Sequence, residues 1–290
     1  MTVFTVSPVV LEIPGRPVDL QLKVSAPTEG TELPIILLSH GQGYSNHLSS
    51  LNGYAPLANH WAEQGFVVLQ PTHLSSRTLD LADVPGAPMF WKERAEDMSA
   101  IIDRLDEIEK AVPQLRNRLD RTKIAVAGHS MGGHTASLLL GMTTEGVSLK
   151  DERIKAGVLL GSTGRGDGLT EIVQGSYSFM LTPDFSDMTT PALVVAGDKD
   201  ASEHLTTNGP EWHMDPYHLA PGPKDLLVLF GAEHGFGGVS GYDVAETTDE
   251  STERVADVQR LTTAYLRSRL HGTDDWQEVQ FTTGYVESKS

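Results

Sequence analysis

The chain has 290 residues, of which 39% are hydrophobic and 21% are charged, and its formal net charge is −17. This composition predicts a globular protein with a sizeable core, and the negative charge argues against nucleic acid, anionic membranes and polyanionic substrates as partners. The absence of cysteine excludes disulfides, a thiolate nucleophile and a cysteine-ligated metal.

Targeting and domain signals are few. No apolar run approaches the roughly 18 residues of a membrane-spanning helix, so we expect no membrane insertion. Residues 1–6 lack the basic start of a signal peptide, and we expect a cytoplasmic protein. With no linker or repeat, residues 1–290 are predicted to form one domain, with a catalytic core at about 15–270 and a polar tail or loosely attached strand at 271–290.

The N-terminal half alternates strands and helices. Residues 18–24 alternate apolar and polar, which predicts a half-buried antiparallel strand. The apolar runs 34–39 and 66–71 predict strands buried on both faces, with a helix from about Tyr54 between them. Residues 92–110 carry an apolar stripe opposite a charged face, which predicts an amphipathic helix with its charges in water.

The alternation continues to the C-terminal part. Buried strands are predicted at 124–127, 156–160, 192–196 and 226–230, and a late helix at about 250–270. This order predicts an α/β fold with a mostly parallel sheet of about eight strands and helices on both faces. Residues 163–190 and 201–225 follow strand ends, and we expect loops that shape a pocket rather than a lid domain.

The most informative motif is Gly128-His129-Ser130-Met131-Gly132, which lies between a predicted strand and a predicted helix. In this context Gly-x-Ser-x-Gly is typical of a nucleophile elbow, in which a tight turn exposes the serine at a helix N-terminus. The alternative interpretation is an ordinary glycine-rich turn. Such a turn would not require a histidine and an acid at later strand ends, whereas a nucleophile elbow does. Ser130 is therefore the candidate nucleophile.

A serine nucleophile needs a histidine base, and a carboxylate to orient that histidine. After such an elbow the acid precedes the histidine along the chain. His234 follows the last buried strand in a glycine-flanked loop and is the candidate base. Asp198 and Asp200 both follow the preceding strand, with Glu203 further along; Asp200 is favoured.

Two N–H groups are expected to hold the negative oxygen of the tetrahedral intermediate. One belongs to Met131, directly after the nucleophile. The other should come from the glycine-rich loop that follows the strand ending at Ser39. Gln42 is assigned to this role, with Gly41 and Gly43 as competitors.

With these motifs in order, the chain resembles the α/β-hydrolase superfamily over residues 15–270 or so, and within it the dienelactone hydrolase-like, chlorophyllase-like and platelet-activating-factor acetylhydrolase-like esterases. The resemblance implies Asp200 as the acid, because that acid commonly closes a Gly-x-x-Asp turn, and Gln42 as an oxyanion donor. Two positions depart from these groups. Dienelactone hydrolases carry cysteine where this chain has Ser130, and chlorophyllases usually carry arginine where it has Met131.

The predicted function is hydrolysis of a carboxylic ester of a neutral or apolar small molecule through an acyl-enzyme, with no cofactor and no metal. Lactone, thioester or amide hydrolysis and acyl transfer would use the same three residues, and a binding protein without turnover is a further alternative. The natural ester and the oligomeric state stay open. Candidate pocket residues are Tyr44, Phe90, Trp91, Phe179, Trp212 and Phe236, together with Met89, Phe185 and Tyr217.

Overall fold

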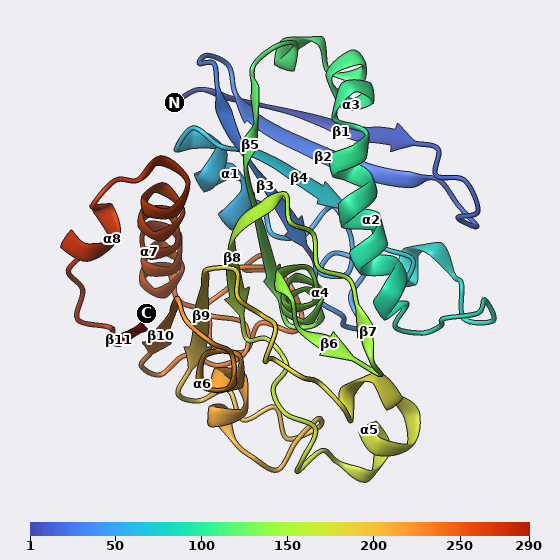
Figure 1. The fold of residues 1–290 in the computed structure, drawn as a ribbon, viewed down its shortest axis with the longest axis vertical. Coiled ribbons are helices and arrows are strands. Elements are labelled where there is room, and N and C mark those ends of the chain that lie inside the picture. Colours follow the sequence, from blue (N-terminus) through green and yellow to red (C-terminus); the bar gives the residue numbers. More distant parts are fainter.

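The computed structural model describes all residues 1–290 and is built on a nine-stranded mixed sheet, one strand more than predicted (Figure 1). Its strand order is β1-β2-β4-β3-β5-β8-β9-β10-β11. The strands are β1 (Val3–Leu11), β2 (Leu20–Pro27), β3 (Leu33–Ser39), β4 (Val67–Pro71), β5 (Leu119–His129), β8 (Ile154–Leu160), β9 (Ala192–Gly197), β10 (Lys224–Leu229) and β11 (Gly284–Lys289); β6 (Thr143–Thr144) and β7 (Val147–Ser148) form a separate hairpin.

The central strands run parallel from β4 through β10, and the edge strands pair antiparallel. The predicted antiparallel strand at 18–24 corresponds to β2, which lies between β1 and β4. Every residue of β3, β9 and β10 is buried. Such strands are covered on both faces by helices, and this is why they read as continuous apolar runs.

Helices cover both faces of the sheet (Figure 1). One apolar core contains residues of α2, α3, α4 and α6, and the other contains residues of α1, α7 and α8. No helix combines the length and the apolarity needed to cross a membrane. The helices are α1 (Ala55–Glu63), α2 (Trp91–Asp103), α3 (Leu105–Ala111), α4 (Met131–Leu140), α5 (Glu171–Ser176), α6 (Asp215–Leu219), α7 (Thr252–His271) and α8 (Asp275–Glu278).

The sheet extends beyond the predicted core on both sides, because β1 and β11 lie outside residues 15–270. The predicted tail at 271–290 holds α8 and then β11, which pairs with β10 along its whole length. A short polar strand gives little apolar signal. It is stabilised by backbone hydrogen bonds to an edge that would otherwise be unpaired.

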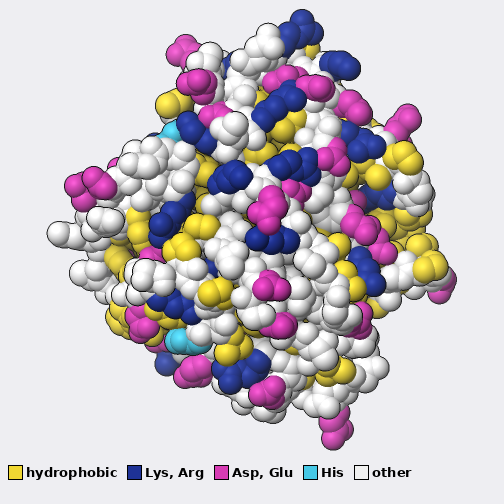
Figure 2. Space-filling model, viewed as in Figure 1, with side chains coloured by type: hydrophobic (Ala, Val, Ile, Leu, Met, Phe, Trp, Pro, Cys, Tyr) yellow, Lys and Arg dark blue, Asp and Glu magenta, His cyan; other side chains and the backbone are white.

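The helix predicted at 92–110 is two helices, separated at Arg104, where the backbone leaves helical geometry. The charged face is also less exposed than expected, because Arg94 and Asp97 are buried. The segments 163–190 and 201–225 contain only short helices, α5 and α6 among them, and no lid domain. Figure 2 shows acidic and basic side chains interspersed on one face of the molecule, with no basic patch there.

Candidate active site

Ser130 occupies a one-residue turn between the end of β5 and the start of α4. Its φ of 57° and ψ of −121° are strained for a residue with a side chain, as expected of a functional turn. A Cβ at Gly128 would lie 2.0 Å from the Gly132 carbonyl oxygen, and a Cβ at Gly132 would lie 2.1 Å from the Ser39 carbonyl oxygen. Only glycine fits at both positions, which explains the motif sterically.

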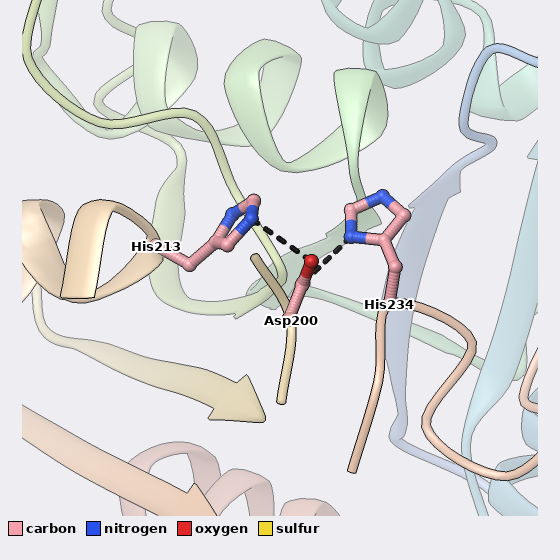
Figure 3. Close-up of side chains that lie close together, drawn as sticks. All are labelled: Asp200, His213 and His234. Carbon is pink, nitrogen blue, oxygen red and sulfur yellow. Dashed lines mark hydrogen bonds and ion pairs between the residues drawn. The ribbon is translucent and has the colours of Figure 1, made fainter. Parts of the chain in front are cut away.

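His234 and Asp200 follow β10 and β9, and they form a hydrogen-bonded pair (Figure 3). His234 Nδ1 lies 2.6 Å from Asp200 Oδ2. An ionised carboxylate only accepts hydrogen bonds, so Nδ1 carries the proton and Nε2 is left as the basic nitrogen. The Asp200 side chain is 1% exposed and that of His234 is 31% exposed. The histidine can therefore meet a substrate, and the carboxylate cannot.

The carboxylate of Asp200 stays ionised despite its burial. Burial raises its pKa, but the imidazoles of His234 and His213 lower it more, so the pKa falls well below the usual range for aspartate. A negative charge at Nδ1 stabilises the imidazolium that forms when Nε2 takes a proton. The pair is thus suited to general base catalysis.

A second histidine lies against the other oxygen of Asp200, and sequence reasoning did not select it. His213 Nε2 lies 3.2 Å from Asp200 Oδ1 (Figure 3). The Ser202 hydroxyl, 3.0 Å from the same Nε2, donates to that Oδ1 at 2.8 Å. His213 Nδ1 lies 2.8 Å from the Ser162 carbonyl oxygen, which only accepts, so Nδ1 carries a proton. No strand directly precedes His213, so its position in the chain does not reveal this contact.

Asp200, His213 and His234 also carry metal-ligand atoms, all within 4.8 Å of one another. Two ligands of one tetrahedral zinc lie about 3.3 Å apart, given zinc–ligand bonds of about 2.0 Å. The 2.6 Å between Asp200 and His234 is shorter and matches a hydrogen bond. The three side chains are arranged as a hydrogen-bonded cluster rather than as a preformed metal cage.

Of the three candidate N–H donors in the loop after β3, only that of Gln42 has no acceptor in the protein. The Gly41 N–H donates to the Tyr54 hydroxyl at 2.9 Å, and the Gly43 N–H donates to the Ser49 hydroxyl at 3.1 Å. The Gln42 N–H donates to no protein group. Because the two competing N–H groups are occupied, the hydrogen-bond pattern favours Gln42 as the donor.

Met131 supplies the first N–H of α4, which has no acceptor within its own helix. Gln42 and Met131 line the same cavity as Ser130. The two residues predicted as oxyanion donors are therefore close to Ser130.

A buried hydrogen-bond chain joins three segments of the site. The Tyr54 hydroxyl accepts from Gly41 and so gives its own proton to His129 Nδ1, 2.9 Å away. His129 Nε2 then donates to the His234 carbonyl oxygen at 2.7 Å. Burial and the neighbouring His234 lower the pKa of His129 to about 3, so the ring is neutral as this pattern requires. Tyr54 and His129 thereby connect three segments: the loop that follows β3 (residues 40–44, the predicted oxyanion loop), the Ser130 turn and the loop that carries His234.

Arg94 of α2 is hydrogen-bonded to the backbone of the loop after β3. Its buried guanidinium donates to the His40 carbonyl oxygen and, at 2.6 Å, to the Ser75 hydroxyl. The Ser75 carbonyl in turn accepts from the Gln42 side chain at 2.9 Å. Burial lowers the pKa of Arg94 to about 9, which leaves it charged at neutral pH. Arg94 lies one turn before Met98 on the apolar stripe, so its burial could have been read from helical spacing.

A second serine–histidine–aspartate array lies beside Arg94. The Ser39 hydroxyl is 2.9 Å from His73 Nε2, and His73 Nδ1 is 3.0 Å from Asp97 Oδ2. Arg16 pairs with the same carboxylate at 2.9 Å. Ser39 and His73 are fully buried and line neither cavity at Ser130, so the array has no access to substrate. It is a structural network.

Two cavities meet at Ser130. One has a volume of about 420 Å³ and includes His234, and the other has a volume of about 450 Å³ and includes Met131. They share Gln42, Gly43, Tyr44 and His204. The wall of the Met131 cavity is largely apolar and comes from Met89, Met131, Ile172, Val173, Tyr177, Met180 and Leu205.

Of the six predicted pocket residues, only Tyr44 lines these cavities. Phe90 and Trp91 line other hollows, and Phe179 stacks on Trp91 with ring centroids 5.9 Å apart. Trp212 and Phe236 are buried in the cores, as are Phe185 and Tyr217. Large aromatic rings contribute most when fully buried, so the cavity wall comes mainly from aliphatic and methionine side chains, with Tyr44 and Tyr177 as its aromatic members. Met89 does line the apolar cavity.

The comparison with known families agrees with this architecture. The chain belongs to the Alpha/beta hydrolase family, whose model matches residues 35–280. It is similar to Cutinase est2 of Thermobifida alba, with 29% identity over 195 residues, which is 66% of this chain and 50% of the cutinase. The chain thus spans about half the length of the cutinases that it matches.

Two further relatives carry other names. Chlorophyllase-2 of Arabidopsis thaliana is 26% identical over 92% of this chain and 82% of its own length. The platelet-activating factor acetylhydrolase of Cavia porcellus is 27% identical over 45% of this chain and 35% of its own length. The relatives with esterase names therefore support a hydrolase and do not agree on one substrate.

Proposed function

We propose that this protein is a serine hydrolase that cleaves a carboxylic ester with an apolar acyl group through an acyl-enzyme. The observation that carries the proposal is the His234–Asp200 hydrogen bond of 2.6 Å at a cavity that also contains the strained Ser130 turn. The relatives named cutinase, chlorophyllase and platelet-activating factor acetylhydrolase support the same reaction class.

The proposed reaction has two halves. The Ser130 hydroxyl attacks the ester carbonyl carbon while His234 Nε2 takes the hydroxyl proton, and the N–H groups of Gln42 and Met131 stabilise the oxyanion. Collapse expels the alcohol, which receives that proton, and leaves an ester on Ser130. A water molecule then attacks this acyl-enzyme with His234 again as base, and the acid is released.

The test is Ser130→Ala, assayed with p-nitrophenyl butyrate beside matched thioester and amide substrates. Because the nucleophile is lost, kcat should fall at least about a thousandfold. A fluorophosphonate probe should label the wild-type serine and leave the variant unlabelled. Exposed Ser148 on β7 provides the control substitution Ser148→Ala, which should change neither readout. Wild-type turnover by a folded Ser130→Ala variant would refute the proposal.

A further inference from the structure

The cavity beside His234 contains a carboxylate without a positive partner. Glu246, in the segment between β10 and α7, accepts from the Ser45 N–H at 2.8 Å through Oε1. Its second oxygen, Oε2, is buried and has no hydrogen-bond partner. A Cβ at Gly43 would lie 2.4 Å from Oε1, so the glycine of the oxyanion loop leaves room for this carboxylate.

Glu246 takes part in none of the ion pairs of the structure, and lysine and arginine line neither cavity at Ser130. Arg77 contacts the same loop, but it donates to the Tyr44 carbonyl oxygen at 3.4 Å. The titratable side chains that line the Glu246 cavity with it are Tyr44, His129, His204 and His234. Burial lowers the pKa of both His129 and His204, so neither is a cation at neutral pH. A cation held in the cavity that Glu246 lines is therefore attracted by a negative charge that has no ion-pair partner.

The two cavities can be assigned to the two halves of an ester, and this step rests on the proposed function. The leaving oxygen must lie beside His234 Nε2 to receive its proton, so the alcohol enters the cavity that His234 lines. The acyl chain is then directed into the apolar cavity on the Met131 side. Glu246 is therefore on the alcohol side.

We propose that Glu246 selects esters of a cationic alcohol, such as a quaternary ammonium or protonated amino alcohol, with an apolar acyl group. Tyr44 lines the cavity, and its hydroxyl bonds to the Ala245 carbonyl at 3.0 Å, which keeps its aromatic ring beside the Glu246 segment. An aromatic face attracts a cation in addition to the carboxylate. The net charge of −17 also favours the approach of a cation. The expectation of a neutral substrate is thus kept for the acyl half alone.

The test compares two esters of the same shape, choline butyrate and 3,3-dimethylbutyl butyrate, in which carbon replaces the charged nitrogen. The quantity measured is kcat/KM for each ester, divided by its rate with hydroxide to remove the difference in leaving group. Glu246→Gln keeps an acceptor for the Ser45 N–H and removes only the charge. We expect it to lower the ratio of kcat/KM for the choline ester to that for the neutral ester about tenfold.

Glu250→Gln is the matched control, because Glu250 is exposed, lies in the same segment and changes the net charge equally. It should leave both rates unchanged. Since the preference is electrostatic, the wild-type ratio of the two rates should also fall as salt is raised. An equal ratio in wild type and Glu246→Gln, or an equal loss in Glu250→Gln, would overturn the role of Glu246.

The wild-type enzyme separates failure of this inference from failure of the proposed function. If it cleaves p-nitrophenyl butyrate and the neutral ester but not choline butyrate, the cationic preference is wrong and the esterase proposal stands. If it cleaves no ester, including p-nitrophenyl butyrate, the esterase proposal fails and the role of Glu246 fails with it.

Discussion

At the scale of single residues, two neighbouring aspartates have different roles. Asp198 and Asp200 lie two residues apart after the same strand, yet they have different partners. Asp200 bonds to His234, whereas Asp198 Oδ1 accepts from the Gly231 N–H at 2.6 Å and joins the two loops that follow β9 and β10. The Asp200 contact fixes the tautomer of the His234 ring. The Asp198 contact stabilises the turn at Gly231.

We expect Asp200→Asn to lower kcat about 10⁴-fold, because an amide no longer fixes the proton on His234 Nδ1. Asp198→Asn keeps an acceptor for Gly231 and should stay near the wild-type rate. Steady-state kinetics on p-nitrophenyl butyrate, with thermal unfolding of both variants, makes the comparison. A larger kcat loss in Asp198→Asn would assign the acid to the other aspartate.

At the scale of elements, the site lies at the C-terminal ends of β3, β5, β9 and β10. Buried side chains from the start of α1 and from α2 stabilise it. Tyr54, directly before α1, connects Gly41 to His129. Arg94 of α2 binds the His40 carbonyl. Neither residue is on the surface, and both act on the loop that carries the Gln42 N–H.

Tyr54→Phe should therefore affect catalysis as well as stability. Removing the hydroxyl leaves the Gly41 N–H and His129 Nδ1 buried without partners, which we expect to cost about 1–3 kcal/mol of unfolding free energy. Because the oxyanion loop loses an anchor, kcat should fall about 10-fold with little change in KM, less than for loss of a donor itself.

A matched control exists on α7. The Tyr265 hydroxyl is buried, lies beside Arg269 and lines neither cavity at Ser130, so Tyr265→Phe removes the same atom without disturbing the loop after β3. It should retain kcat. If Tyr54→Phe loses stability alone, with kcat unchanged, Tyr54 supports only the fold.

For the molecule as a whole, buried neutral histidines link folding to pH. Burial is the main cause that lowers the pKa of His40, His73, His129 and His134, the last two to about 3. Between pH 6.5 and 3 the unfolded chain binds protons that the native protein does not. The unfolding free energy therefore falls with decreasing pH, by about 1.4 kcal/mol per pH unit for each histidine.

His134 on α4 allows this linkage to be measured. Both of its ring nitrogens are buried without hydrogen-bond partners, and the ring packs edge-on against Phe179. His134→Leu should raise the unfolding free energy at pH 7 by about 1–3 kcal/mol. The number of protons taken up on unfolding, obtained from the slope of the unfolding free energy against pH, should also fall by up to one. Urea titrations between pH 7.5 and 4.5 measure it. The exposed substitution His47→Gln is the control, and an unchanged slope in His134→Leu would contradict the assignment.

Much of the fold follows from local pattern. The apolar runs became β3, β4, β5, β8, β9 and β10, because strands buried on both faces must be apolar throughout. The polar β11 was predicted only as a tail or a loose strand, since its stability comes from pairing with β10. The charged face of residues 92–110 predicts exposure to water, because charge usually implies exposure, whereas Arg94 and Asp97 are each buried against a partner.

The sequence by itself determined the elbow and the order of the strand ends, because a strained turn and close backbone approach admit few residue types. Ser130, Asp200 and His234 could be nominated on that basis. Only the tertiary structure decided what surrounds them. His213 and Glu246 come from segments without local signal, and the helical spacing that begins at Tyr54 does not indicate the contacts of its hydroxyl. Ser45 and Glu246 are 201 residues apart. Such contacts depend on how loops pack in space, and neighbouring residues along the chain do not encode them.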